Sequence, residues 1–284
     1  MRVSTLHRRR RKTTTRRRRD RLTAKTADPF VLYQRSVQSP DVDVLFLSRL
    51  FKRTTGRPLR RFREDFCGTA RLCCEFVRLH RDNQSIGVDL DAPTLDWARR
   101  HNLAQLEPAQ RGRVRLLLDD VVTVGGVRAD LVAAMNFSYS IFKTRAALRA
   151  YAANVRRGLR RGGLFVLDAF GGSQALEEME EETDHKDFTY VWDQASFDPI
   201  SHHAICKIHF TFKDGSRLRN AFVYDWRLWT LPEMQEILTE AGFKDVHVLW
   251  EMTDRATNEG NGVFRRVARG AADPGWIAYV VGQA

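Results

Sequence analysis

The sequence predicts an α/β fold with a mostly parallel seven-stranded sheet, helices on both faces and an antiparallel β insertion after the fifth strand. Three observations carry this prediction. From Phe30 onward, short apolar runs alternate with amphipathic segments at the spacing of strand–helix–strand units. Polar residues follow the ends of four successive predicted strands, where ligands bind in open α/β sheets. Between residues 171 and 230 this alternation gives way to consecutive segments of β character.

The first βα unit lies at residues 62–70, Phe-Arg-Glu-Asp-Phe-Cys-Gly-Thr-Ala. The run has the pattern of a strand end, an acidic residue and a turn of small residues that opens into a helix. Residues 85–91 supply a second strand that ends on a carboxylate, and Asp89 lies 20 residues past Thr69. This outline is typical of nucleoside-binding βαβ units, because N–H groups at the helix N-terminus meet the ligand and the carboxylate accepts hydrogen bonds from ribose hydroxyls.

The other elements of the α/β part follow from apolar periodicity. Helices are expected at residues 42–51, with Asp41 as a candidate cap, and at 72–80, 94–105, 148–159 and 231–241. Further strands are expected at 114–118, 130–136, 164–170, 246–250 and 276–281. Gly162 and Gly163 are suited to stopping the helix that precedes the fifth strand.

The insertion at 171–230 is predicted to be an antiparallel flap. Its segments are 188–192, 203–212 and 217–226, and Asp214-Gly215 joins the last two as a hairpin. Alternate residues of these segments are apolar, so the flap is expected to have one buried face. His203, Cys206 and His209 lie on one of its strands, where they cannot converge on a single ion, and no metal site is predicted there.

Charge divides the chain at residue 28. Residues 1–28 hold ten arginines and two lysines against two aspartates, which gives +10 of the net charge of +12. Such a segment repels itself and buries nothing, so a disordered Arg-rich tail is expected at 1–28 and a single domain at 29–284. The tail could bind RNA or another polyanion. A dispensable extension and a translation start placed too early are the alternative explanations.

Composition also bears on the compartment. No apolar run reaches the roughly 18–20 residues that a membrane span requires, so no membrane association is expected. The four cysteines, Cys67, Cys73, Cys74 and Cys206, have neither metal nor disulfide spacing. They are typical of buried thiols in a reduced compartment, and a cytoplasmic location is expected.

The run Glu64-x-x-Cys67-Gly68-Thr69 resembles the first motif of class I S-adenosylmethionine-dependent methyltransferases, which usually reads acidic-x-Gly-x-Gly-Thr-Gly. In this alignment Phe66 stands in place of the first glycine and Ala70 in place of the third. Together with Val-Asp-Leu-Asp at 88–91 and Met-Asn-Phe-Ser at 135–138, the run is similar to a bacterial branch of that superfamily over residues 29–284. The resemblance implies a Rossmann-like sheet and an S-adenosyl-L-methionine cofactor.

The resemblance also implies a role for each strand end. Asp89, beside Leu90, would hold the ribose hydroxyls, Asp120 would hold the adenine amino group and Val121 would pack on the adenine. Asn136 and Phe137 would border the sulfonium, and Tyr33 would cover the cofactor from an N-terminal helix. The backbone of Phe66, Cys67, Gly68 and Thr69 would pass beneath the methionine moiety, and Glu64 and Asp65 at the strand end belong to the same cofactor site.

A small-molecule acceptor, methylated on N or O by in-line displacement, is expected between the flap and the ends of the fourth and fifth strands. Its candidate contacts are Ser138, Tyr139, Asp168, Phe170, Tyr190, Trp192 and Asp225. Positioning and desolvation accelerate such a displacement without a dedicated base. If the acceptor must lose a proton, Asp168 or Tyr139 could take it.

Two other functions remain open at the level of sequence. An RNA or protein methyltransferase could use the basic tail, although residues 135–138 lack the Asp/Asn-Pro-Pro-aromatic loop that resembles base-methylating enzymes. Phe66 in place of a glycine also allows a catalytically silent S-adenosylmethionine-binding protein. Neither the acceptor nor the oligomeric state follows from these residues.

Overall fold

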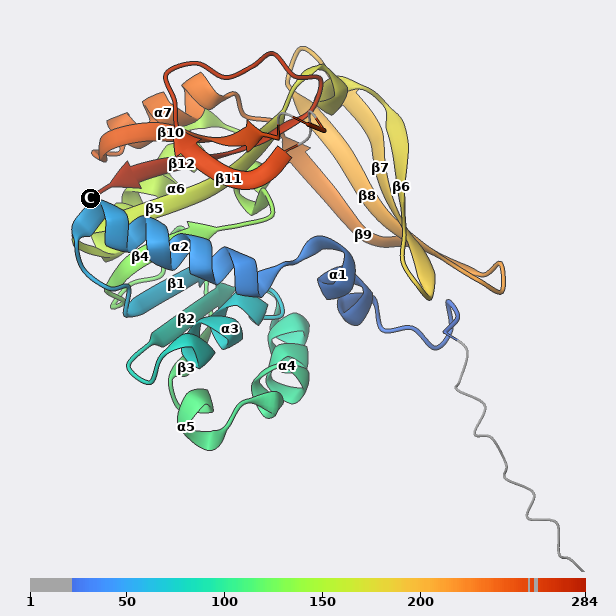
Figure 1. The fold of residues 1–284 in the computed structure, drawn as a ribbon, viewed down its shortest axis with the longest axis horizontal. Coiled ribbons are helices and arrows are strands. Elements are labelled where there is room, and N and C mark those ends of the chain that lie inside the picture. The colour runs from blue at the N-terminus through green and yellow to red at the C-terminus, as the bar shows by residue number, and fades with distance from the viewer. Residues whose placement is uncertain (1–21, 255, 258–259) are drawn as a thin grey trace, which may run out of the picture.

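The computed structural model describes residues 22–254, 256–257 and 260–284 (Figure 1). Its larger sheet has eight strands in the order β11-β10-β12-β5-β4-β1-β2-β3. The strands are β1 (Arg61–Asp65), β2 (Gln84–Asp89), β3 (Val114–Leu118), β4 (Ala129–Ala134), β5 (Leu159–Gly171), β10 (Lys244–Thr253), β11 (Gly260–Arg266) and β12 (Trp276–Gln283). Strands β1 to β5 pair in parallel, whereas β12 runs antiparallel between β5 and β10. The strand order reverses between β1 and β4, so the carboxyl ends of these strands form the expected ligand-binding edge.

The α/β architecture and the parallel sheet are confirmed, and the strand count of seven is corrected to eight. The additional strand is β11, which pairs antiparallel with β10 at the edge of the sheet. Its sequence, Gly-Asn-Gly-Val-Phe-Arg-Arg, is exposed at six of seven positions. A strand that buries so little has no apolar alternation, which explains why periodicity did not reveal it.

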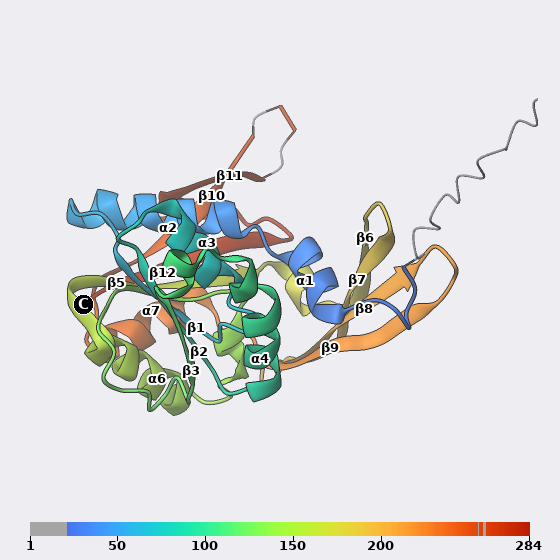
Figure 2. The same cartoon turned by 90° about the horizontal axis from the view of Figure 1, so that it is seen from below.

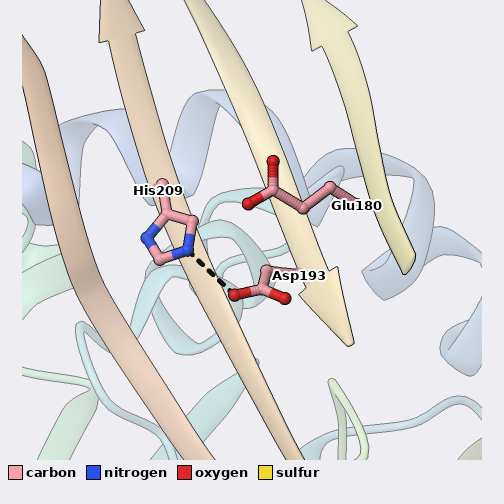
Figure 3. A group of neighbouring side chains, drawn as sticks. All are labelled: Glu180, Asp193 and His209. Atoms are coloured by element: carbon pink, nitrogen blue, oxygen red, sulfur yellow. Dashed lines mark hydrogen bonds and ion pairs between the residues drawn. The ribbon is translucent and has the colours of Figure 1, made fainter. Parts of the chain in front are cut away.

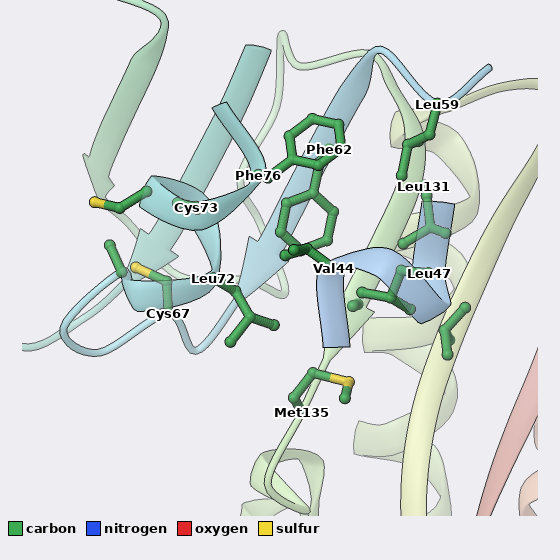
Figure 4. Packing of buried hydrophobic residues seen from close by; sticks show 14 of the residues in the cluster. Val44, Leu47, Leu59, Phe62, Cys67, Leu72, Cys73, Phe76, Leu131 and Met135 are labelled. Atoms are coloured by element: carbon green, nitrogen blue, oxygen red, sulfur yellow. The ribbon is translucent and has the colours of Figure 1, made fainter. Parts of the chain in front are cut away.

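Helices cover both faces of this sheet. They are α1 (Pro29–Val37), α2 (Pro40–Thr55), α3 (Arg71–Leu79), α4 (Ala92–His101), α5 (Pro108–Arg111), α6 (Arg145–Gly158) and α7 (Leu231–Glu240), with short 3-10 turns at Leu103–Gln105, Ser138–Ile141 and Ser173–Leu176. Helices α2 to α4 pack on one face, where Figure 4 shows Val44 and Leu47 against Phe62, Phe76 and Leu131. Helices α6 and α7 bury the opposite face. Adjacent β4 residues divide between the two cores, as the two-residue repeat of a strand requires.

Most expected helix boundaries shift by one to four residues in the structure, and three of these shifts change the local interpretation. Helix α2 begins at Pro40, so Asp41 lies in its first turn and does not cap it, and α4 ends at His101. Helix α6 ends at Gly158, and Gly162 and Gly163 lie within β5. A Cβ on Gly163 would lie 2.8 Å from the carbonyl oxygen of Arg160 and 2.9 Å from that of Asp130, so this glycine permits a close backbone approach.

The flap is a separate four-stranded antiparallel sheet in the order β6-β7-β8-β9. Its strands are β6 (Met179–Asp184), β7 (Phe188–Asp198), β8 (His203–Phe212) and β9 (Arg217–Arg227). The predicted inward face of β8 is buried at every second residue from Ala204 to Phe212. Strand β6 was not expected, because Met-Glu-Glu-Glu-Thr-Asp is an acidic, exposed edge.

Helix α1 lies between the flap and the α/β body, as Figure 2 shows from below. Leu32 of α1 is buried in the apolar cluster of the flap. Residues 22–28 also contact the flap, where the Ala24 N–H donates to Ser216 Oγ over 3.0 Å. The part of the predicted disordered tail at 1–21 lies outside the described residues, whereas 22–28 form part of the packed body. Within the described chain, no helix has the length and apolar character needed to cross a membrane.

Candidate functional site

The turn after β1 and the end of β2 are tied together. The Gly68 N–H donates to Asp89 Oδ2 over 2.7 Å, and the Asp91 N–H donates to Asp89 Oδ1 over 2.9 Å. The turn has left-handed φ values at Phe66 (56°) and Ala70 (54°), a conformation that glycine adopts with the least strain. The predicted strand–turn–helix unit is therefore present, with Asp89 at its edge.

Close packing fixes the backbone of this turn. A Cβ on Gly87 of β2 would lie 2.7 Å from Cys67 Sγ, which is closer than such atoms approach. Cys67 is buried in the core beneath the turn, so its side chain faces away from the ligand edge. Cys67 can therefore contact a ligand at that edge only through its backbone, as the resemblance to the methyltransferase motif implies.

A first cavity of about 450 Å³ opens at the ends of β1, β2 and β3. Five of the predicted cofactor residues line it: Phe66, Asp89, Leu90, Asp120 and Val121. The sequence interpretation missed four others, Asp91, Val122, Ile141 and Phe142. Asp91 could have been found from its Asp-Ala-Pro helix-start pattern, since its side chain caps α4. The side chains of Ile141 and Phe142 arrive from a 3-10 turn that carries no comparable signal.

The Phe66 ring forms a wall of this cavity. Its ring centroid lies 5.6 Å from that of Tyr151 and 6.1 Å from that of Phe142, both in edge-to-face geometry. The ring is therefore held against the α6 side of the site, and the open volume beside Asp89 and Asp120 remains.

Glu64 and Asp65 take different positions because successive side chains of a strand point to opposite faces. Asp65 is buried against Arg63, with 2.6 Å between Arg63 Nε and Asp65 Oδ1, and the Tyr151 hydroxyl donates to Asp65 Oδ2 over 2.9 Å. The Asp65 side chain thus closes a buried ion pair under α6 and does not line the first cavity.

Glu64 lies on the other face of β1 and is also buried. Its Oε2 accepts a hydrogen bond from the Cys73 N–H over 3.2 Å at the first turn of α3. Burial raises the pKa of Glu64 to about 8, and the nearby Asp89 carboxylate adds to this rise. The side chain reaches the start of α3 and does not line the first cavity.

Helix α1 is fastened to the motif turn and to α4. The Gln34 side chain donates to Thr69 Oγ1 over 3.0 Å. Asp28 accepts from the Phe30 N–H over 2.9 Å through Oδ1 and from Trp97 Nε1–H over 2.7 Å through Oδ2. One carboxylate thus caps α1 and links it to α4.

A second cavity of about 120 Å³ lies between α1, the loop after β4 and the inner face of the flap. Tyr33, Asn136 and Phe137 of the predicted cofactor set line it, together with the predicted acceptor contacts Tyr190 and Trp192. Tyr224, Trp226, Val37 and Ile208 complete it. Phe170 borders it through Phe137, with 4.6 Å between the ring centroids.

The two candidate bases support the loop at this cavity. Asp168 accepts hydrogen bonds from the N–H groups of Asn136 (2.7 Å) and Phe137 (2.9 Å), both of which have a φ of 57°. The Tyr139 hydroxyl is buried and donates to the backbone oxygen of Asp168 over 2.8 Å. Burial raises the pKa of Asp168 to about 7 and that of Tyr139 well above its usual value.

Two other acceptor candidates do not line the second cavity. Ser138 Oγ donates to the Met135 carbonyl over 2.7 Å. Asp225 is exposed and forms an ion pair with Lys143 over 2.6 Å and with His203. Its strand position turns it to the outer face of β9, whereas Tyr224 and Trp226 turn inward.

One cluster on the outer face of the flap has metal-ligand residue types. The ligand atoms of Glu180, Asp193 and His209 lie within 4.8 Å of one another (Figure 3). His209 Nδ1 accepts from the Asn220 N–H over 2.7 Å, so its proton is on Nε2, which donates to Asp193 over 3.1 Å. Glu180 pairs with Arg217 over 3.2 Å. Hydrogen bonds and an ion pair therefore account for the cluster, and Nε2 has no free lone pair for a metal.

No known sequence family and no curated protein matches this chain. Its fold does match solved structures. An S-adenosylmethionine-dependent methyltransferase from Clostridium acetobutylicum ATCC 824 is 18% identical with a TM-score of 0.59, covering 89% of this chain and 96% of that one. CalS10, an amino pentose methyltransferase from Micromonospora echinaspora, is 16% identical with a TM-score of 0.63, covering 90% and 96%. The glycopeptide N-methyltransferase MtfA, complexed with S-adenosyl-L-methionine, is 19% identical with a TM-score of 0.55, covering 87% and 95%. The chain has the fold of these methyltransferases.

Proposed function

We propose that this protein transfers the methyl group of S-adenosyl-L-methionine to a small-molecule acceptor. The observation that supports it most strongly is the first cavity, where Asp89 at the end of β2 and Asp120 just after the adjacent β3 lie next to the motif turn. Carboxylates at these two positions suit the ribose hydroxyls and the adenine amino group of an adenosyl ligand. The fold supports the same assignment, because CalS10 and MtfA were crystallised with S-adenosylmethionine bound.

Each strand end then has a task in binding. Asp89 accepts from the ribose, Asp120 from the adenine amino group, and Val121 packs on the adenine. The turn from Glu64 to Thr69 carries the methionine moiety on its backbone, and Leu90 borders the ribose. Tyr33 of α1 covers the far side. When bound, the cofactor supplies an electrophilic methyl group on a positively charged sulfur.

The second cavity is the acceptor site in this proposal. It adjoins Asn136 and Phe137, which would border the sulfonium, and the flap closes it on the other side. A pocket walled by α1 and the flap in this way would fix the acceptor in line and limit the water around it. Asp168 and Tyr139 act as positioning residues, because both of their polar groups are engaged in holding the loop at Asn136.

Two observations argue against the alternative functions. The Phe66 ring leaves the first cavity open, so the substitution at that position does not by itself silence the site. The acceptor pocket is small and walled by α1, which does not suit an RNA base on a polymer or a protein side chain on a folded partner.

All four cysteines are free and buried, which supports a reduced, cytoplasmic compartment.

Calorimetry with S-adenosylmethionine tests the proposal on the wild type, Asp89→Ala and Asp96→Ala. Removing the ribose acceptor is expected to weaken affinity by about 10- to 100-fold, since hydrogen bonds to a charged group contribute about 1.5–3 kcal/mol. Asp96 is exposed on α4 and pairs only locally with Arg99, so Asp96→Ala controls for the change in charge. Equal affinity of wild type and Asp89→Ala, with both proteins folded, rules the ribose assignment out.

A further inference from the structure

The aromatic second cavity identifies the chemical class of the acceptor. We infer that the acceptor is an amine without an anionic group, held by its nitrogen within a cage of aromatic side chains. This inference rests on the proposed methyl transfer and specifies its substrate. Six of the nine lining residues are aromatic: Tyr33, Phe137, Tyr190, Trp192, Tyr224 and Trp226.

The rings of the cage converge from four parts of the fold: α1, β7, β9 and the loop after β4. Trp192 of β7 lies 6.0 Å from Trp226 and 6.1 Å from Tyr224 between ring centroids, and both partners are on β9. Phe137, from the loop after β4, meets Trp226 edge to face at 6.2 Å. Aromatic faces carry partial negative charge, so several rings around one small volume attract an ammonium group.

The charges around the cage favour the same class. None of its nine lining residues is charged. A third cavity of about 360 Å³ shares Trp192 with it and offers room for the rest of an acceptor. The charged residues that line this third cavity are Glu181 and Glu251. A phosphate or carboxylate on the acceptor would therefore meet two carboxylates and no cation, whereas an amine or a neutral polar group would be accommodated.

The proton balance separates amines from hydroxyl acceptors. An amine that has released its proton to water attacks the methyl carbon with its lone pair, the C–S bond breaks with its electrons going to sulfur, and a neutral thioether and an ammonium product result. The positive charge thus passes from sulfur to nitrogen inside the cage, and no base is needed in that step. A hydroxyl acceptor would have to lose its proton to a neighbouring group.

No residue of the cage is suited to take that proton. Its titratable groups are the hydroxyls of Tyr33, Tyr190 and Tyr224. Burial raises the pKa of Tyr33 to about 12 and also raises those of Tyr190 and Tyr224, so all three hydroxyls remain protonated at neutral pH. The nearby Asp168 carboxylate is bonded to two backbone N–H groups. The cage therefore stabilises a cation better than it deprotonates an alcohol.

A matched pair of probes tests this inference. Choline and 3,3-dimethylbutan-1-ol have the same shape, but only choline carries a positive charge. Calorimetry in saturating S-adenosylhomocysteine should show choline binding about tenfold more tightly than the alcohol. Tyr190→Phe keeps the aromatic face and should keep this preference, whereas Tyr190→Leu should reduce it. Tyr190 is half-buried at the cavity rim, which makes both variants compatible with folding.

The outcomes separate this inference from the proposed methyl transfer. If S-adenosylhomocysteine binds but the alcohol matches or exceeds choline, or if neither probe binds, the amine assignment is overturned while the cofactor site stands. If S-adenosylmethionine and S-adenosylhomocysteine both fail to bind, the proposed methyl transfer fails, and the choline preference in their absence still reports on the cage. An assay of S-adenosylhomocysteine formation over amines and alcohols should give turnover with amines alone, and turnover with an alcohol contradicts the inference.

Discussion

A single missing side chain at Gly87 allows the cofactor turn to pack on β2. Gly87→Ala would place a Cβ 2.7 Å from Cys67 Sγ and 3.0 Å from Leu116 Cδ2. Overpacking of this kind costs about 1–3 kcal/mol of unfolding free energy. Because the clash lies beneath the motif turn, we expect weaker S-adenosylmethionine binding as well as lower stability, measured by urea unfolding and calorimetry.

The double variant with Cys67→Ala serves as the control for that clash. In the Cys67→Ala protein, which lacks the sulfur, Gly87→Ala should lower the unfolding free energy by about 1 kcal/mol less than it does in the wild type. The two effects are coupled because the side chains are in contact. Strictly additive costs in the two backgrounds would mean that Cys67 is not the obstacle.

Glu64 should make stability fall as pH rises. Its pKa is about 8 in the folded protein and close to 4.5 in an unfolded chain, so the folded state retains a proton that the unfolded state has lost between these values. The contribution of Glu64 to the unfolding free energy is complete below about pH 4.5 and is lost progressively as the pH rises to about 8. Glu64→Gln, which keeps an oxygen for the Cys73 N–H, should be close to wild type in stability near pH 5 and exceed it by roughly 4 kcal/mol near pH 8.5.

Urea unfolding at the two pH values, without cofactor, measures this effect. Glu75→Gln is the matched control, because Glu75 sits on the outer side of the same helix α3 and pairs with Arg78 over 2.8 Å. A pH-independent difference between Glu64→Gln and wild type would contradict the assigned titration.

At the residue scale, the sequence predicted the strand-end carboxylates but not every direction in which they point. Asp89 and Asp120 reach the first cavity because Asp89 ends β2 and Asp120 comes just after β3, where the chain leaves the sheet edge. Because successive side chains of β1 point to opposite faces of the sheet, Glu64 and Asp65 must point in opposite directions. This rule does not indicate on which face the ligand binds. The Arg-x-Asp spacing of Arg63 and Asp65 places both on one face and was the available signal for their ion pair.

At the scale of elements, Asp28 connects α1 to α4 and should control how firmly α1 is held. Asp28→Ala removes the helix cap, typically about 1 kcal/mol, and the hydrogen bond from Trp97. Asp28→Ser keeps a capping oxygen but is too short to reach Trp97. We expect amide exchange in α1 to be fastest for Asp28→Ala and intermediate for Asp28→Ser, with β4 unchanged. Wild-type protection of α1 in Asp28→Ala would show that the cap and tether do not hold the helix.

Elements that bury a periodic face were the predictable ones. Strand β8 buries alternate residues from Ala204 to Phe212, and the sequence identified both the strand and its inner face. Strands β6 and β11 form exposed edges and carry no such pattern, so only their pairing partners define them. The ring-to-ring packing of the cage likewise depends on β7 and β9 meeting the loop after β4, which no local pattern specifies.

At the scale of the whole molecule, the net charge is concentrated in residues 1–21, whereas residues 22–28 are neutral in sum and contribute to the packed body. Arginines and lysines give residues 1–21 a net charge of +10, whereas Leu22, Ala24 and Ala27 pack against the flap. Deleting residues 1–21 should therefore leave the unfolding free energy and S-adenosylmethionine affinity unchanged. Deleting 1–28 also removes this packing and the α1 cap, and should lower stability by about 2 kcal/mol.

The same pair of deletions tests polyanion binding by the basic segment. Full-length protein should bind single-stranded RNA with an affinity that falls steeply as salt rises, because each neutralised phosphate releases counterions. Either deletion should abolish that binding, since the remaining chain carries only +2. Turnover of a small acceptor should persist after deletion of 1–21, because the residues that line the two cavities lie between positions 33 and 226. RNA binding that survives the shorter deletion would place the polyanion site on the folded body, and lost turnover would link the basic segment to catalysis.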